Sequence, residues 1–290
     1  WVMSKTIAIT GASGFIGSFL KNYFRESGYP TIALQRKQNE NDHHLRLFDL
    51  SRPETIVPSL FEGVDILIHC AFVKKQKNPG KTDINLVGTK AMLAAAKQAG
   101  VKNFVFFSSV SAHEQALSYY AKSKRKVETV FQGEGSVVLK CGLVIGKGGL
   151  FAQMLSYSLA KKIIPLLDGG KQPVQFISID SVALALRHII ETDMNGSYVL
   201  AQPHPVNYKQ LFLAIEKHFS KSFFFVDLPF FLFKAVLSFT DRLPIHLPVT
   251  MENLYGLKAM KTLDNKLDAQ DLQLAEELIE KLLERYFPRR

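Results

Sequence analysis

Three glycines within seven residues, in the stretch TGASGFIG at positions 10–17, constrain this chain more than any other feature. The stretch follows a short apolar run at 5–10 and opens an amphipathic run. A strand, a glycine turn and a helix in this order are typical of a dinucleotide-binding unit. There Gly11 permits the tight turn, Gly14 lets the backbone approach a ligand, and Gly17 lets the helix press on the sheet. A pyrophosphate binds at such a helix N-terminus, because free N–H groups and the helix dipole favour anions.

The first half of the chain alternates short apolar runs with helical patterns. Strands are predicted at residues 5–10, 31–35, 45–50, 64–70, 103–109 and 136–142. Helical patterns lie between them, most clearly at 83–99 and 117–131. Nearly continuous apolar strands are typical of parallel strands that are covered on both faces. The alternation therefore predicts an α/β fold with a Rossmann-like, doubly wound parallel sheet.

After residue 146 the alternation ends. Helices are predicted near 149–160, 181–192, 208–219 and 229–240, with a terminal helix at 267–286, and short strands near 174–179, 197–201 and 223–227. This mixture predicts a dinucleotide-binding Rossmann domain over 3–146, to which later segments return. Residues 147–290 are interpreted mainly as a smaller, mixed substrate-binding lobe.

Composition excludes several classes of protein. The chain has 290 residues, of which 47% are hydrophobic and 21% charged, so a sizeable core is expected and global disorder is not. The net charge of +10 is interpreted as a solvated surface, with attraction for phosphorylated cofactors, acidic substrates or a membrane face as the alternative. No nucleic-acid-binding module is recognisable, so a nucleic-acid partner is not predicted.

Cysteine usage and hydropathy indicate a cytoplasmic protein. Cys70 and Cys141 each follow an apolar run and are predicted to be buried free thiols, with neither a disulfide framework nor metal-ligand spacing. The first residues lack the pattern of a signal peptide. The most apolar segment, 223–239, is interrupted by Asp227, Pro229 and Lys234, so it predicts a strand, a turn and a packed helix rather than a membrane span. Contact with a membrane surface stays open as an alternative.

Further motifs follow the glycine stretch in a fixed order. They are Asp49-Leu50, HCA at 69–71, NLVGT at 85–89, FVFFSS at 104–109, YAKSKRKVE at 120–128 and FISIDSVALAL at 176–186. Together with TGASGFIG they resemble the extended short-chain dehydrogenase/reductase superfamily, the NAD-dependent epimerase/dehydratase family. The resemblance covers about 5–190 and implies an NAD(P)-dependent oxidoreductase, epimerase or dehydratase that acts on a small molecule. A homodimer is an expectation of the family alone.

The second predicted strand ends in Gln35, Arg36 and Lys37. An acidic residue at this point accepts from the ribose 2′-hydroxyl of NAD, whereas an arginine suits the 2′-phosphate of NADP. A guanidinium pairs with a phosphate in bidentate fashion. The sequence therefore favours NADP, and NAD stays open as the alternative.

Tyr120 and Lys124 lie four residues apart in a predicted helix and so share one face. A nearby lysine cation is expected to lower the pKa of a tyrosine hydroxyl. In the family the lysine also holds the nicotinamide ribose, and the tyrosine exchanges a proton with a substrate oxygen while hydride moves. The resemblance implies that Ser109 hydrogen-bonds the same oxygen. The catalytic residues are thus expected to be Ser109, Tyr120 and Lys124, and no metal is predicted.

The remaining site residues follow from the matched motifs. Cofactor contacts are expected from Gly11, Ser13, Gly14, Phe15, Ile16, Gly17, Arg36, Asp49, Leu50, Cys70, Ala71, Phe72, Asn85, Ser108, Tyr120, Lys124, Cys141 and Leu143. Glu128 is expected to be a structural partner of Lys124, and His69 a structural histidine whose hydrogen bonds are satisfied. Asn85 is expected either to order the active-site backbone or to start a helix.

Two departures from the family pattern bear on the reaction. Only ten residues separate Ser109 from Tyr120, and Lys140-Cys141 stands where the family often has Arg-Pro. Both weaken a nucleotide-sugar assignment. The sequence favours hydride transfer to or from a carbonyl or secondary alcohol; a nucleotide-sugar epimerase or dehydratase with recycled NAD is the alternative. An alternative of another class is a non-catalytic dinucleotide-binding sensor or assembly factor.

Overall fold

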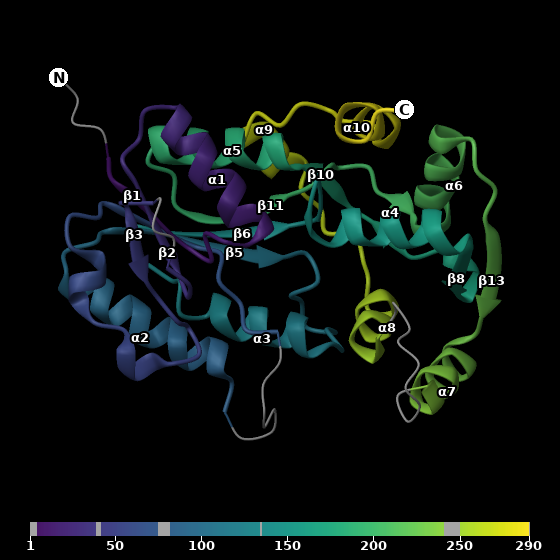
Figure 1. The fold of residues 1–290 in the computed structure, drawn as a ribbon, viewed down its shortest axis with the longest axis horizontal. Helices are drawn as coiled ribbons and strands as arrows, with labels where there is room; N and C mark the ends of the chain where they lie inside the picture. Colours follow the sequence, from purple (N-terminus) through teal and green to yellow (C-terminus); the bar gives the residue numbers. More distant parts are fainter. Residues whose placement is uncertain (1–4, 39–41, 75–81, 134, 241–249, 290) are drawn as a thin grey trace. The chain divides into compact units, whose positions relative to one another are not determined.

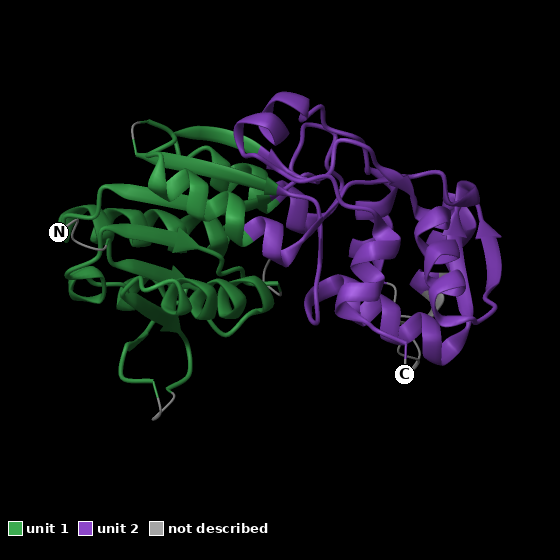
Figure 2. Cartoon of the chain, turned by 90° about the horizontal axis from the view of Figure 1, so that it is seen from above, with its two compact units in different colours: residues 1–108, 123–140, 183–198 green, residues 109–122, 141–182, 199–290 purple. Residues whose placement is uncertain are grey.

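The computed structural model describes residues 5–38, 42–74, 82–133, 135–240 and 250–289. The chain divides into two compact units (Figure 2). Unit 1 comprises 1–108, 123–140 and 183–198, and unit 2 comprises 109–122, 141–182 and 199–290.

A seven-stranded sheet forms the middle of unit 1, with the strand order β11-β6-β5-β4-β1-β2-β3. Its strands are β1 (Ile7–Thr10), β2 (Thr31–Gln35), β3 (Leu45–Leu47), β4 (Ile66–His69), β5 (Asn103–Ser109), β6 (Ser136–Cys141) and β11 (Gly196–Leu200). The pairs β1–β2, β1–β4, β2–β3 and β4–β5 are parallel. The predicted α/β fold with a doubly wound parallel sheet is confirmed.

Helices cover both faces of this sheet. In Figure 1, α1 (Phe15–Glu26) and α5 (Ile179–Glu191) lie on one face, and α2 (Ile84–Gln98) and α3 (Tyr119–Glu128) lie on the opposite face. Two short 3-10 helices, η1 (Pro53–Thr55) and η2 (Pro58–Phe61), precede β4. Because both faces are covered, β1 and β4 are buried along their whole length, which explains why their sequences are apolar up to the final residues Thr10 and His69.

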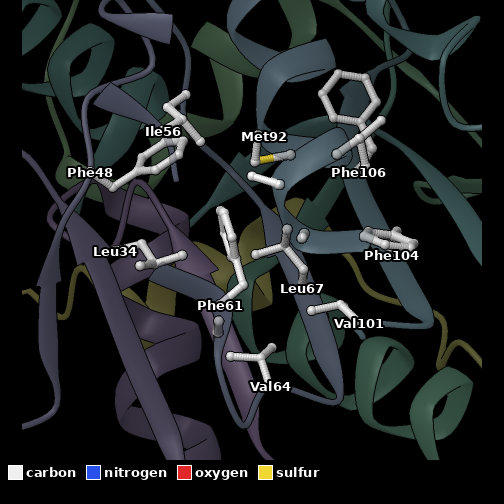
Figure 3. Close-up of a cluster of buried hydrophobic side chains, with 14 of the residues drawn as sticks. Leu34, Phe48, Ile56, Phe61, Val64, Leu67, Met92, Val101, Phe104 and Phe106 are labelled. Atoms are coloured by element: carbon white, nitrogen blue, oxygen red, sulfur yellow. The ribbon is translucent and has the colours of Figure 1, made fainter. Parts of the chain in front are cut away.

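The core of unit 1 lies between the sheet and α2 (Figure 3). Phe61 from η2, Leu67 from β4 and Met92 from α2 are wholly buried there. Phe104 and Phe106 add the β5 side of the cluster. Burying side chains of this size stabilises the folded chain by roughly 1.5–3 kcal/mol each. This core fixes β4 and β5, and with them the residues that follow each strand.

Unit 2 holds three two-stranded sheets and most of the later helices. The sheets are β7 (Leu143–Ile145) with β10 (Phe176–Ser178), β8 (Ile163–Leu167) with β13 (Phe224–Leu228), and β9 (Pro173–Val174) with β12 (Val206–Asn207). The helices are α4 (Gly149–Lys161), η3 (Asp168–Gly170), α6 (Tyr208–Phe219), α7 (Phe230–Thr240), α8 (Met251–Lys258), α9 (Lys266–Asp271) and α10 (Ile279–Tyr286). Regular strand–helix alternation does stop in this part of the chain, as predicted.

The prediction of one terminal helix over 267–286 is wrong. The chain leaves the helical conformation after α9, where Gln273 has a φ of +52°, and re-enters it at α10. Gln202 binds the intervening segment twice: its amide donates to the Ala275 carbonyl at 3.1 Å and its oxygen accepts from the Glu277 N–H at 3.0 Å. These tertiary hydrogen bonds outweigh the local helical pattern.

Candidate functional site

The glycine stretch forms the turn between β1 and α1 in unit 1. Gly11 has a φ of +68°, and a Cβ there would lie 2.8 Å from the amide nitrogen of Ala71. A Cβ on Gly17 would lie 2.3 Å from the carbonyl oxygen of Gly11. A Cβ on Gly14 would meet only the Gly11 oxygen, at 3.2 Å. Gly11 and Gly17 are therefore required by close backbone packing, whereas space remains beside Gly14.

The N-terminus of α1 carries no capping side chain. Gly14 is the N-cap residue, and the first turn holds no acidic residue. Ser13 and Gly14 are exposed, while Phe15 and Ile16 are half-buried. The first N–H groups of a helix have no intrahelical partners. This end of α1 therefore fits a pyrophosphate, which supplies acceptor oxygens and negative charge.

Cationic side chains follow β2. Arg36 and Lys37 are exposed. Gln35 turns its side-chain amide back to the Lys37 carbonyl, at 2.9 Å. None of the described residues that directly follow β2, at 36–38, is acidic, so they fit an added phosphate better than a free ribose 2′-hydroxyl.

Asp49 and Leu50 lie beyond β3. The Asp49 carboxylate accepts from the Ser51 N–H at 3.0 Å and from the Ser51 hydroxyl at 2.7 Å. Leu50 is buried, and a Cβ on Gly88 would lie 2.2 Å from the Leu50 carbonyl oxygen. The glycine of NLVGT thus allows α2 to approach this backbone closely.

His69, at the end of β4, is held between two hydroxyl groups. Its Nδ1 lies 2.7 Å from the Thr10 hydroxyl and its Nε2 lies 3.0 Å from the Thr89 hydroxyl. Burial, with a smaller effect from the Lys124 cation, lowers the pKa of His69 to about 3. The expectation of a satisfied structural histidine is confirmed. Sequence reasoning missed both threonines, although they belong to the TGASGFIG and NLVGT motifs.

Asn85 orders the backbone that follows β4. Its side-chain oxygen accepts from the Val73 N–H at 2.7 Å, and its amide donates to the Val73 carbonyl at 3.2 Å. Asp83 caps α2 by accepting from the Asn85 N–H at 3.1 Å. Of the two expected roles, backbone ordering is therefore supported by direct contacts to Val73, next to Phe72.

Lys124 is buried on α3. Its ammonium group donates to the Phe107 carbonyl at 2.5 Å and lies over the rings of Phe106 and Phe72, at 4.7 and 5.2 Å. The backbone of β5 and two aromatic rings thus fix the position of this cation.

Glu128, one turn further along α3, was expected beside Lys124. Its carboxylate accepts from the Ser108 hydroxyl at 2.5 Å and pairs with the Lys140 ammonium at 3.0 Å. Lys140 is the residue that stands in place of the family's arginine. The substitution of lysine for the family's arginine thus keeps a cation at this point. The Ser108 hydroxyl is bound to Glu128.

In unit 2, the Ser109 side chain lies close enough to the Tyr120 hydroxyl to act on its pKa. The Ser109 hydroxyl also lies 2.9 Å from the Ser111 hydroxyl and accepts from the Ser111 N–H at 3.2 Å. The two contacts with Ser111 fix the Ser109 oxygen at the carboxyl end of β5, near the Tyr120 side chain.

The pKa of Tyr120 is raised to about 12, so the expected lowering by Lys124 is wrong for this structure. Burial is the larger cause and the neighbouring Cys141 adds to it, while the Ser109 side chain acts in the opposite direction and lowers the pKa. Tyr120 is 39% exposed as a whole residue, although the burial of its surroundings raises this pKa. The hydroxyl therefore carries its proton throughout the neutral range.

Two contacts at the start of α3 are not predicted by the sequence. The Ser118 hydroxyl accepts from the Ala121 N–H at 3.2 Å, and the Glu252 carboxylate accepts from the Tyr120 N–H at 3.4 Å. Serine is common at the residue that caps a helix, so Ser118 could have been predicted as the start of α3. Glu252 belongs to α8, a helix that was not predicted, so nothing placed it near Tyr120.

The structure distributes the expected site residues over both units. Unit 1 holds Gly11, Ser13, Gly14, Phe15, Ile16, Gly17, Arg36, Asp49, Leu50, Cys70, Ala71, Phe72, Asn85, Ser108 and Lys124, and unit 2 holds Ser109, Tyr120, Cys141 and Leu143. Tyr120 and Lys124 lie one turn apart on α3. Leu143 pairs with Phe176 between β7 and β10.

The two cysteines differ in burial. Both are free thiols, and Cys141 is buried as expected. Cys70 is only half-buried, because β4 ends one residue before it. Among the described residues, no group of three or more His, Cys, Asp or Glu side chains is arranged to hold a metal ion.

Comparison with known proteins gives relatives of several functions. A ceramide reductase of Caulobacter vibrioides is 27% identical over 200 residues, which cover 66% of this chain and 62% of that protein. A photosystem II assembly factor of Cyanophora paradoxa is 24% identical over 195 residues, which cover 64% of this chain and 56% of that protein. The chain therefore spans about three fifths of the length of these curated relatives.

Solved structures of similar fold hold dinucleotides. The human epimerase family protein SDR39U1 with NADPH has a TM-score of 0.73 at 16% identity, covering 97% of this chain and 98% of that one. Another similar structure holds NAD. The model of the NAD-dependent epimerase/dehydratase family, whose members are NAD(P)-dependent oxidoreductases, epimerases or dehydratases, matches residues 7–201. The predicted resemblance is confirmed, and this chain belongs to the NAD-dependent epimerase/dehydratase family.

Proposed function

We propose that this chain is an NADP-linked oxidoreductase that reduces a carbonyl group on a small molecule or oxidises the corresponding secondary alcohol. The observation that carries the proposal is the placing of Ser109 at the end of β5 beside the Tyr120 side chain, with Lys124 one turn further along the same helix as Tyr120. An oxygen atom bound by both hydroxyl groups is a suitable acceptor for the Tyr120 proton.

The residues of unit 1 support dinucleotide binding. The uncapped N-terminus of α1 would hold the pyrophosphate, and the exposed Arg36 would pair with a ribose 2′-phosphate. By analogy with the family, the buried Lys124 would bind the nicotinamide ribose. When bound, the nicotinamide supplies or accepts the hydride.

The protonation state of Tyr120 favours reduction. With a pKa of about 12 the hydroxyl carries its proton at neutral pH, so it is ready to donate to the oxygen of a carbonyl substrate. Ser109 would hold that oxygen in place. The similarity to a protein named ceramide reductase supports reduction rather than oxidation. The residues of unit 2 beyond Tyr120 would form most of the substrate-binding lobe.

Two other functions remain as alternatives. An epimerase or dehydratase would use the same hydride machinery with NAD, but Gln35 and Arg36 favour NADP. A dinucleotide-binding assembly factor without turnover is favoured by the similarity to the photosystem II assembly factor. The presence of both Tyr120 and Lys124 supports the enzyme.

The first experiment is a titration of the purified chain with NADPH and with NADH. We expect NADPH to bind at least tenfold more tightly, a difference of about 1.4 kcal/mol. Arg36→Glu is expected to abolish this preference, whereas the matched control Arg52→Glu, at an exposed arginine of the same unit, retains it. Tighter binding of NADH by the unsubstituted chain would contradict the NADP assignment and place the epimerase first.

The second experiment tests turnover with a panel of carbonyl compounds. Tyr120→Phe is expected to lower the rate of NADPH oxidation by about 10²- to 10⁴-fold, because it removes the proton donor. Tyr119→Phe is the matched control: its fourth neighbour is Ser123 rather than a lysine, and its rate should stay close to the original. NADPH binding should survive in both variants. An unchanged rate in Tyr120→Phe would contradict the assignment of Tyr120 as the proton donor.

A further inference from the structure

Large apolar side chains are exposed at the start of the β8–β13 sheet and, separately, on α7, all within unit 2. Phe224 and Ile163, which are register partners in the sheet, are 70% and 51% exposed. Phe231 and Leu232 on α7 are 69% and 44% exposed. Single exposed apolar residues are ordinary, whereas contiguous ones are typical of interaction surfaces. Phe224 and Ile163 are such neighbours, because they pair in the sheet. Figure 1 shows β8 and β13 side by side, with α7 directly following β13.

The fold explains why these side chains remain outside. On α7, Phe233 and Leu237 lie one turn apart and are buried in a cluster with Leu167 and Leu254. A helix buries one face against such a cluster, so Phe231 and Leu232 point elsewhere. Local packing thus leaves this apolar surface available.

Lysines accompany the exposed apolar residues. The segments 151–167 and 217–240 contain five lysines, Lys161, Lys162, Lys217, Lys221 and Lys234, and all five are exposed. They contain one acidic residue, Asp227, whose carboxylate accepts from the Gly169 N–H at 2.7 Å. Two more acidic residues directly adjoin these segments: Asp168, which is exposed, and Glu216, whose carboxylate accepts from the Phe223 N–H. Lys161, Lys162 and Lys221 stand close in sequence to Ile163 and Phe224, at the start of the two parallel strands.

We propose that Ile163 and Phe224, with Lys161, Lys162 and Lys221, form a docking surface for the headgroup layer of an anionic lipid bilayer. Aromatic and aliphatic side chains enter the boundary between headgroups and acyl chains, and lysines near that boundary are attracted to anionic lipids. A second copy of the chain fits less well, because two such surfaces would bring their lysines together. Among the described residues no helix is long and apolar enough to cross a membrane, so this contact is peripheral. The inference does not depend on the proposed oxidoreductase activity.

The test is co-sedimentation of the whole chain with phosphatidylcholine vesicles, with or without phosphatidylglycerol. We expect binding to the mixed vesicles at low salt, weaker binding at high salt, and little binding to phosphatidylcholine alone. The double variant Lys161→Gln/Lys221→Gln should bind the mixed vesicles roughly thirtyfold more weakly. Phe224→Ser should bind about tenfold more weakly, because it removes a large apolar side chain.

Matched controls separate this surface from the general positive charge of the chain. Lys102→Gln/Lys266→Gln removes two exposed lysines elsewhere, and Leu267→Ser removes a leucine that is 74% exposed on α9. Retained binding by both controls supports the proposal. An equal loss in the controls, equal binding to both vesicle types, or no binding would overturn it. So would a dimer in sedimentation velocity that Phe224→Ser converts to a monomer, since the surface would then join two copies.

Discussion

His69 shows how one buried side chain makes stability depend on pH. Its pKa lies near 3 in the folded chain against 6.5 for the free side chain, because burial disfavours the imidazolium. The folded state therefore binds fewer protons than the unfolded state between these values, and its stability falls as the pH falls. The full effect corresponds to about 5 kcal/mol.

We predict that the free energy of unfolding in urea, which is unaffected by His69 above pH 6.5, decreases steadily from pH 6.5 towards 3. His69→Gln cannot titrate, yet its amide can still bond to the hydroxyls of Thr10 and Thr89. The variant should be less stable at pH 7 and show a flatter decline in acid. Parallel declines in the two proteins would contradict the assignment of this pH dependence to His69.

Lys140 is expected to matter through Glu128. The two side chains are 22% and 15% exposed, and their ion pair lies next to the Ser108 hydroxyl. Lys140→Gln leaves a half-buried carboxylate without its cation, so we predict a loss of about 1–3 kcal/mol in the free energy of unfolding. Lys140→Arg, which keeps the charge, should lose much less. Equal losses in urea titrations would mean that chain packing rather than charge holds this position.

At the scale of the element, α2 and α8 provide a matched pair of helix glycines. A Cβ on Gly88 in α2 would lie 2.2 Å from the Leu50 carbonyl, whereas a Cβ on Gly256 in α8 would meet nothing within 4 Å. We predict that Gly88→Ala destabilises the fold by about 2 kcal/mol or more, because the helix must move away from Leu50. Gly256→Ala should stabilise it by about 0.5–1 kcal/mol, through helix propensity. Thermal unfolding of the two variants measures the expected loss of stability in the first and the expected gain in the second.

The same scale shows what the sequence could predict. Strands β1, β2 and β5, and the glycine turn after β1, carry local patterns that agree with their final positions. The break between α9 and α10 does not, because hydrogen bonds from the distant Gln202 impose it. The pKa of Tyr120 was likewise unpredictable, since its direction depends on burial that only the folded chain provides. Features that depend on neighbouring residues could be predicted from the sequence, whereas features that depend on contacts between distant residues could not.

At the scale of the whole molecule, the chain passes between the two units five times, and every passage falls inside a helix or strand. The boundaries at 108/109, 122/123 and 140/141 lie within β5, α3 and β6. Those at 182/183 and 198/199 lie within α5 and β11. Unfolding one unit alone would therefore cut five hydrogen-bonded elements. Their continuity opposes separate unfolding of the units.

We therefore predict one cooperative transition in calorimetry, with equal calorimetric and van't Hoff enthalpies. NADPH should shift the whole transition although most of the residues expected to bind it belong to unit 1, because stabilising one unit stabilises elements that continue into the other. At roughly 100 times the Kd, a ligand that binds only the folded state adds about 2.7 kcal/mol to its stability. Two transitions of which NADPH moves only one would show that α3 and α5 break at the unit boundaries. Arg36→Glu supplies the control, because it should leave the transition single and reduce its response to NADPH: a tenfold loss of affinity lowers the added stability to about 1.4 kcal/mol.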